Sequence, residues 1–212
     1  FESYPGVRLG VVFALGIDNS KKGLFLDKLR SEEAVVRKKL EGVELSGHKY
    51  IAPWREIYRS FGSKPSEYSS SIEALLKRVV KGKDLSDINP LVNMYNALSL
   101  KYLLPFGGED LDRVKGDVRL EFCVGSESGT YLGSVEPEHC SKGEVAYLDD
   151  LGFICRRWNW REGKRTMLTE STKNVVLVVE AVPEVSDDEL RLAVEEMVSE
   201  IQSNLGGEIS AY

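Results

Sequence analysis

The segment from residue 88 to residue 101, INPLVNMYNALSLK, constrains the fold most, because its pattern predicts a largely buried helix that carries amides. Asn89 is a favourable N-cap, and Pro90 fits the first helical position, where a missing N–H costs nothing. Apolar residues cover most of the helix circumference, which indicates a place in the core. Asn93 and Asn96 continue the line of Asn89 along one face. Because buried amides are costly unless they are hydrogen-bonded, this stripe either ties down neighbouring backbone or lines a pocket.

The rest of the chain predicts an α+β fold, with a mainly antiparallel sheet flanked by helices in a single domain over residues 1–212. Residues 7–17 are apolar and β-branched, as in a buried strand, and residues 118–124 alternate apolar and polar side chains, as in a half-buried strand. Ser70 and Ser186 each open a capping box, which predicts a helix after them. Further helices are expected at 31–40, with Ser31 as cap, and at 54–61, and further strands at 144–148, 152–155, 166–169 and 174–182.

The net charge of −6 argues against a dedicated, tight nucleic-acid binder, because such binding depends largely on neutralising phosphates with Lys and Arg. A transient encounter through a local basic patch remains compatible with it. Arg156, Arg157 and Arg161 are interleaved with Trp158 and Trp160, a combination that suits phosphate contact and base stacking. The alternative is a hairpin whose tryptophans pack inward beneath exposed arginines, and the sequence leaves both interpretations open.

Cysteine and histidine usage argues against a metal centre. The three cysteines form no Cys-x-x-Cys pair and the two histidines no metal-binding helix motif, so neither a metal nor a cofactor is expected. An odd number of unpaired cysteines is typical of free thiols in a reducing compartment. No apolar run approaches the ~20 residues of a membrane span, and the first residues show no signal-peptide pattern. We therefore expect a cytoplasmic protein without a membrane partner.

The amide-bearing segment also resembles a known family pattern. It is similar to INxxVDxTNYVMLExGQPLHAFD in the B-three/B-four domain of the beta subunit of bacterial phenylalanyl-tRNA synthetase, a domain that hydrolyses wrongly charged tRNA. The matching residues are Ile88, Asn89, Val92, Asn93 (for Asp), Tyr95 (for Thr), Asn96, Leu100 and Pro105. Residues 169–181 resemble the family's VTxxTxxVLLExA, and residues 54–62 and 69–76 resemble free-standing proteins built from this domain. The resemblance covers most of residues 50–183.

The resemblance implies hydrolysis, in trans, of the ester at the 3′ end of a misacylated tRNA. Such an ester is labile, so the site mainly has to position a water and stabilise the oxyanion. The resemblance assigns this catalytic work to Asn93, Asn96 and backbone N–H groups at Gly107 and Gly108. Gly107 stands where the family has its editing His, so activity here is expected to show no imidazole titration near ~6.5.

The aminoacyl group is expected to contact Asn89, Tyr95 and Glu180, with Tyr95 filling part of the pocket in place of a Thr. Aminoacylated tRNA is the expected partner, through the Arg–Trp cluster, whereas DNA binding and amino-acid activation are not expected. A non-catalytic module that binds tRNA or an amino acid is the alternative. A third possibility is a structural partner without a site, in which the amide stripe is satisfied internally. For an editing protein we expect Asn93 and Asn96 to face a solvent-connected cavity between their helix and the late strands.

Overall fold

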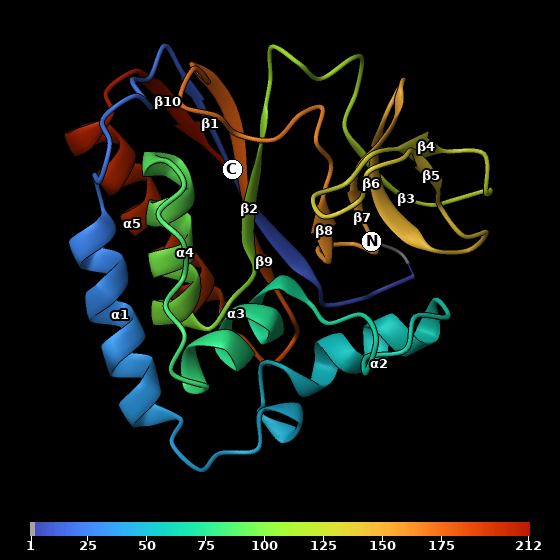
Figure 1. Cartoon of the computed structure of the whole chain (residues 1–212), viewed down its shortest axis with the longest axis horizontal. Helices are drawn as coiled ribbons and strands as arrows, with labels where there is room; N and C mark the ends of the chain where they lie inside the picture. Colours follow the sequence, from blue (N-terminus) through green and yellow to red (C-terminus); the bar gives the residue numbers. More distant parts are fainter. Residues whose placement is uncertain (1–2) are drawn as a thin grey trace.

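A four-stranded antiparallel sheet forms the centre of one half of the molecule (Figure 1). The structure, a computed structural model, describes residues 3–212. The strand order is β10-β1-β9-β2, and β1 pairs with β9 along its whole length. These strands are β1 (Arg8–Leu15), β2 (Phe106–Asp110), β9 (Asn174–Ala181) and β10 (Glu208–Ala211). The strand β2 therefore lies at an edge of this sheet, next to the other half of the molecule.

Helices pack against and beside this sheet (Figure 1). They are α1 (Leu26–Lys39), η1 (Leu45–Gly47, a 3₁₀ turn), α2 (Ala52–Ser60), α3 (Ser71–Val80), α4 (Pro90–Tyr102) and α5 (Asp187–Asn204). The helix α4 is buried from Pro90 to Leu100 except at Tyr95, as its apolar pattern predicts. The side chain of Asn89 accepts a hydrogen bond from the Val92 N–H at 3.1 Å, which confirms the predicted N-cap.

The other half of the molecule is built from short strands. A second sheet has the order β3-β6-β7-β8, and β4 pairs with β5. Their bounds are β3 (Arg119–Phe122), β4 (Ser128–Gly129), β5 (Glu138–His139), β6 (Val145–Asp149), β7 (Gly152–Arg156) and β8 (Arg161–Glu162). A small apolar cluster that includes Cys123, Cys140 and Phe153 fills this half. The predicted α+β class with antiparallel strands and flanking helices is confirmed, although the strands are divided among several sheets.

One strand prediction needs correction, and the strand β2 was not predicted. Residues 166–169 form no strand, because the hydroxyl of Thr172 accepts a hydrogen bond from the Thr169 N–H and holds the segment in a local turn. In contrast, residues 106–110, for which no strand was predicted, form β2. A Cβ at Gly108 would lie 2.3 Å from Leu177 Cδ2, so this strand needs a glycine to pack against β9.

The predicted start of the first helix is also wrong. The helix α1 begins at Leu26 rather than after Ser31, and it follows Phe25, which has a left-handed backbone (φ 65°). Ser31 lies inside the helix, because helix-forming residues precede it and tertiary packing of Leu29 extends the helix backwards. No helix within residues 3–212 combines the length and apolarity that crossing a bilayer requires. The assignment of residues 1–212 to one domain stays a prediction.

Candidate functional site

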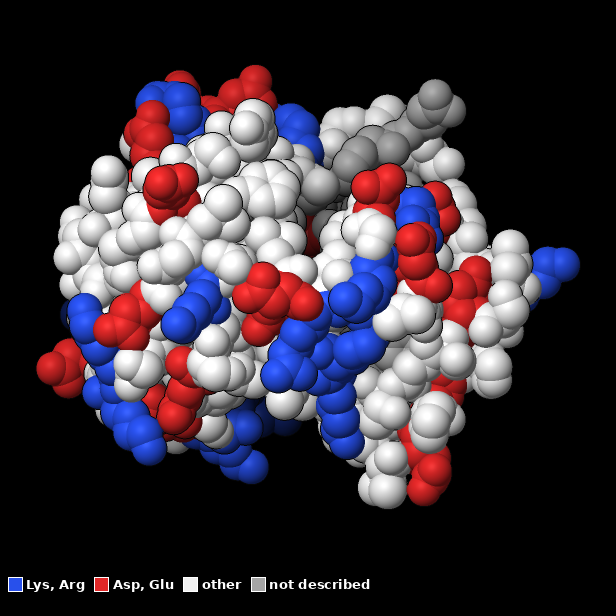
Figure 2. Space-filling view, turned by 90° about the horizontal axis from the view of Figure 1, so that it is seen from above, with Lys and Arg blue, Asp and Glu red and all other residues white. Residues whose placement is uncertain are grey.

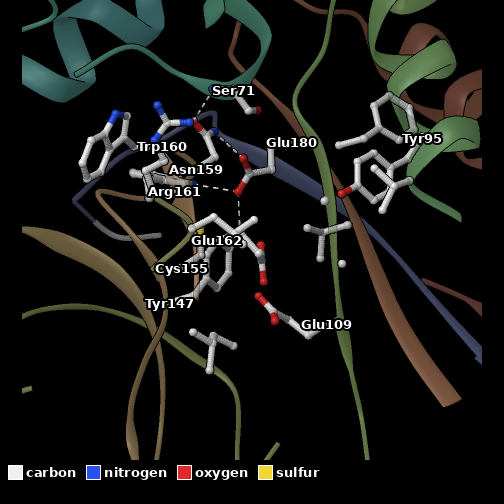
Figure 3. A pocket seen from close by; sticks show the side chains of 18 of the residues that line it. Ser71, Tyr95, Glu109, Tyr147, Cys155, Asn159, Trp160, Arg161, Glu162 and Glu180 are labelled. Carbon is white, nitrogen blue, oxygen red and sulfur yellow. Dashed lines mark hydrogen bonds between the residues drawn. The ribbon is translucent and has the colours of Figure 1, made fainter. Parts of the chain in front are cut away.

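A cavity of about 320 Å³ lies where the free edge of β2 meets the second sheet. Its walls come from both halves of the molecule: α3, α4, β2 and β9 on one side, and β7, β8 and the turn between them on the other. Figure 3 shows the polar side chains that converge there. The polar residues that line the cavity include Tyr95, Asn96, Glu109, Asn159, Glu162 and Glu180.

The room in this cavity depends on one glycine of β2. Successive residues of a strand face opposite sides, so Gly107 and Glu109 face the cavity while Gly108 faces Leu177. A Cβ added at Gly107 would meet no atom within 4 Å. The position that the resemblance aligned with the family's His is therefore open space beside the cavity.

Gly108 presents its backbone N–H to the cavity. The Glu180 N–H donates to the Pro105 carbonyl oxygen at 3.0 Å, which fixes the phase of the β2–β9 ladder. Because hydrogen-bonded and non-bonded pairs alternate, the N–H groups of Gly108 and Asp110 point away from β9. The Asp110 N–H accordingly donates to the Thr166 carbonyl at 2.8 Å. The Gly108 N–H thus lies on the open edge of β2 at the cavity.

Asn96 and Tyr95 reach the cavity from α4. Asn96 is 8% exposed, and its side-chain amide has no hydrogen-bond partner within residues 3–212. The Tyr95 hydroxyl points toward β2 and the cavity (Figure 3). Burial, together with the nearby Glu162 and Glu109 carboxyls, raises the pKa of Tyr95, so its phenol stays neutral and can donate or accept a hydrogen bond.

Glu180 lines the cavity, but its carboxylate already has protein donors. Its Oε1 accepts from the Trp158 indole N–H at 2.8 Å and from the Tyr147 hydroxyl at 2.6 Å, and its Oε2 accepts from the Asn159 amide. Burial raises the pKa of Glu180, and these three hydrogen bonds act in the opposite direction. The bonds hold the turn in which Arg157 and Trp158 adopt left-handed backbones with φ of 47° and 63°. Glu180 therefore has a structural role in addition to any contact with a ligand.

Two other acids in the cavity, Glu109 and Glu162, face each other from β2 and β8 (Figure 3). Glu109 Oε2 and Glu162 Oε1 are buried, and neither accepts a hydrogen bond from another described group. Burial, and then the charge of Glu162, raise the pKa of Glu109 well above its usual range, and burial also raises the pKa of Glu162. Two carboxyls that repel in this way cannot both be ionised without a cation between them. The sequence analysis did not predict this pair, because its two residues are far apart in the chain.

Cys155 also lines the cavity, but its thiol is expected to be unreactive. Burial, followed by the charges of Glu162 and Glu109, raises the pKa of Cys155 well above its usual range. Because the thiolate is the nucleophilic form, this thiol is a poor nucleophile at neutral pH. The two histidines are elsewhere: His139 is an exposed residue of β5 and His48 follows η1. Within residues 3–212 no group of three or more His, Cys, Asp or Glu side chains could hold a metal ion.

Asn93 and Asn89 lie outside the cavity, so the expectation that Asn93 and Asn96 share it is wrong. Asn93 is fully buried, and its amide donates to Asp87 at 2.7 Å and to the Leu24 carbonyl at 3.2 Å. Its oxygen accepts from the Ile88 N–H at 3.2 Å. Asn89 caps α4, as described above. The three amides therefore divide between the two roles that the sequence allowed: Asn89 and Asn93 form hydrogen bonds to neighbouring backbone, and Asn96 faces the cavity.

The predicted Arg–Trp cluster is mostly buried, so it is not the exposed patch that tRNA binding was expected to use. Arg156 is 4% exposed, with a two-pronged ion pair to Glu144 at 2.9 and 2.8 Å. The Arg157 guanidinium lies 3.8 Å from the Tyr68 ring centroid and also pairs with Glu144. Trp158 is fully buried. These arginines are buried because they pair with a buried carboxylate that is distant in the sequence, so the local sequence does not predict their burial.

Arg161 and Trp160 remain at the surface side of this turn. Arg161 is exposed, lies 5.4 Å from the Trp160 ring centroid and borders the cavity. Trp160 is half-buried and also borders the cavity. Figure 2 shows charges of both signs on the upper face, with Lys and Arg side chains gathered near the junction of the two halves. A local basic surface thus exists on a chain with a net charge of −6.

Fold and site together define an α+β domain with an internal cavity between its helix-covered sheet and a smaller β half. The chain belongs to the B3/4 domain family, whose family model matches residues 53–202. This match confirms the resemblance to the B-three/B-four domain, and it ends later in the chain than the expected 50–183.

Among solved structures, an N-terminal fragment of the phenylalanyl-tRNA synthetase beta-subunit from Pyrococcus horikoshii is similar, with 16% sequence identity and a TM-score of 0.44. The similar part covers 57% of this chain and 41% of that chain, so it spans less than half of the relative's length. No curated protein sequence matches this chain significantly.

Proposed function

We propose that this protein hydrolyses, in trans, the ester bond between a wrongly attached amino acid and the 3′ end of a tRNA. The observation that carries the proposal is a pair of neutral donors at one cavity: the Asn96 amide, which has no partner among the described residues, and the Gly108 N–H on the open edge of β2. Membership of the B3/4 domain family supports the same substrate class. The cavity volume of about 320 Å³ is in the range of small-molecule sites.

The reaction needs little from the protein beyond position and charge stabilisation. Water adds to the ester carbonyl, the carbonyl oxygen takes up negative charge, and the bond to the 3′ oxygen then breaks with return of a proton to that oxygen. The Asn96 amide and the Gly108 N–H are the donors for the developing oxyanion, and removal of one such donor costs about 10²–10³-fold in rate. A covalent route through Cys155 is disfavoured, because its thiol stays protonated.

The tRNA encounter is proposed to involve Arg161 and Trp160 at the cavity border rather than the whole Arg–Trp cluster. Arginine suits phosphate contact and tryptophan suits base stacking. With a net charge of −6, the encounter is expected to be weak and to weaken further with salt. We place this step in the cytoplasm, where charged tRNA is available.

A deacylation screen tests the proposal. Purified protein is incubated with a panel of correctly and incorrectly charged tRNAs, and release of the amino acid is compared with buffer alone. On a responsive substrate, Asn96→Ala should lower the rate about ten- to a thousandfold, while His139→Ala on the exposed strand β5 serves as control and keeps the wild-type rate. Thermal unfolding of each variant establishes that it is folded. A panel without any accelerated hydrolysis, or a fully active Asn96→Ala, would refute the proposal.

A non-catalytic module that binds aminoacyl-tRNA or an amino acid is the second candidate. It is favoured by one observation: the described part of the cavity offers no imidazole and no ionised thiol. The same screen separates the two candidates, because a binding module retains charged tRNA on a filter without accelerating its hydrolysis.

A further inference from the structure

The carboxyls of Glu109 and Glu162 are unusual among the buried acids of this protein. Four other buried carboxylates have an arginine: Glu33 pairs with Arg30, Glu73 with Arg55, Glu144 with Arg156 and Asp149 with Arg165. Buried Glu180 has no arginine, but three neutral groups donate hydrogen bonds to it. Glu109 is only 8% exposed and faces the cavity, yet within residues 3–212 it has no ion pair, and Glu162 has none either. Because a buried acid is costly without a partner, a pair of such acids at a cavity points to a cationic ligand.

Within residues 3–212 no cationic side chain forms an ion pair with either carboxyl. Arg165 is close enough to lower the pKa of Glu109 somewhat, but its guanidinium is bound to both oxygens of Asp149. The neighbours are neutral: the buried Thr166 hydroxyl, whose hydrogen bonding lowers the pKa of Glu109, and the Tyr95 phenol. A ligand cation would therefore find two carboxyl groups and neutral oxygens around it.

We propose that Glu109 and Glu162 form a subsite for a primary ammonium group, specifically the free α-amino group of an aminoacyl ester. An ammonium carries three N–H donors, which can serve two carboxylates and one neutral oxygen at once. A quaternary ammonium has no N–H to donate. The assignment to an aminoacyl ester rests on the proposed function, whereas binding of the ammonium itself does not require hydrolysis.

The position of the pair fits this assignment. In an aminoacyl ester a single carbon separates the amino nitrogen from the carbonyl carbon, so the ammonium site must adjoin the oxyanion donors. Glu109 directly follows Gly108 along β2, and the N–H of Gly108 is one of those donors. The pair can hold a proton when the cavity is empty, and binding of an ammonium then releases that proton. A substrate whose amino group is acylated offers no cation and should be rejected.

The test uses the full chain and small ligands, without tRNA. A panel of amino acid amides, which are stable analogues of the ester, is titrated by calorimetry at pH 7 alongside the N-acetylated form of each amide. At least one free amide should bind at least about tenfold more tightly than its N-acetyl form. Repeating the titration in two buffers of different ionisation enthalpy should show net release of protons on binding.

Two isosteric variants and one control complete the experiment. Glu109→Gln and Glu162→Gln should each weaken binding of the free amide at least about tenfold and abolish proton release. Glutamine resembles the protonated carboxyl, so both variants should fold, which thermal unfolding verifies. Glu170→Gln, at an exposed acid 3.9 Å from Lys22, should bind as the wild type does.

The inference is overturned if no free amide binds, if N-acetyl amides bind equally well, or if the Gln variants keep wild-type affinity. Displacement of the bound amide by Mg²⁺ alone, with binding of the metal lost in the same variants, would assign the pair to a divalent cation instead and also overturn it. Because no hydrolysis is measured, amide binding without deacylation would leave the ammonium subsite standing while the proposed function failed.

Discussion

The neighbouring glycines of β2 provide a sharp test of the cavity, because one faces open space and the other faces a packed sheet. A Cβ at Gly108 would lie 2.3 Å from Leu177 Cδ2 and 2.8 Å from the Val176 carbonyl oxygen. The leucine can rotate, but the backbone oxygen cannot move without shifting β9. Overpacking of this kind costs about 1–3 kcal/mol. For a chain of this length that corresponds to a fall in Tm of roughly 2–12 °C.

Gly107→Ala should behave in the opposite way. Its Cβ meets nothing within 4 Å, and its backbone is not left-handed, so no strain opposes the alanine. Loss of unfolded-state freedom should leave stability unchanged or raise it by up to about 1 kcal/mol. A larger side chain, as in Gly107→Leu, would extend into the cavity and should abolish binding of amino acid amides while the protein stays folded.

Differential scanning calorimetry of the two alanine variants, together with amide titration of Gly107→Leu, measures these effects. The reasoning is refuted if Gly107→Ala is the less stable of the alanine variants. It is also refuted if a folded Gly107→Leu binds amides as the wild type does, since the ligand would then lie elsewhere.

Three further predictions follow from contacts described above. Asn93→Ala should lose about 1–3 kcal/mol of stability, because it leaves the partly buried Ile88 N–H and Leu24 carbonyl without their partner. Its deacylation rate per folded molecule should stay the same, as denaturant titration and the screen would show. Arg156→Ala should cost up to about 3–5 kcal/mol, because it removes the two-pronged partner of the buried Glu144 carboxylate and leaves only Arg157 beside it. Arg161→Glu should change stability by less than about 0.5 kcal/mol and weaken tRNA binding, measured against salt. The pKa values of Glu109 and Glu162 are raised in the folded state, so the two carboxyls favour the folded state at low pH. This contribution to stability is lost as pH rises from about 4.5 through the raised pKa values. The Tm of the wild type relative to that of Glu162→Gln should therefore fall across that pH range.

Sequence analysis succeeded where the cause of a structure is local. The caps at Asn89 and Ser186 were predictable because each side chain bonds an N–H within three residues of itself. The strand β2 was not, because its glycine spacing makes sense only opposite Leu177, more than sixty residues later. Local turn chemistry at Thr172 likewise overrode the strand pattern of residues 166–169.

The site was predictable only in part for the same reason. Asn96, Tyr95 and Glu180 border the cavity as the family resemblance implied, although their roles stay predictions. The burial of Arg156 depends on Glu144, and the meeting of Glu109 with Glu162 depends on how two sheets approach each other. No periodicity of the chain encodes such a meeting, because it is a property of tertiary packing.

The hydrogen bonds around Glu180 have a consequence for substrate size. Glu180 on β9 holds the Asn159 amide, and the oxygen of Asn159 in turn accepts from the Tyr58 hydroxyl at 2.9 Å and from the Ser71 N–H at 3.3 Å. One carboxylate and one amide thus link β9, α2 and the start of α3, and two of these elements, β9 and α3, line the cavity. A change at residue 180 or 159 can therefore alter the size of group that the cavity admits while the oxyanion donors and the carboxyl pair stay the same. In a protein built this way, the dimensions of the site and its chemistry can vary independently.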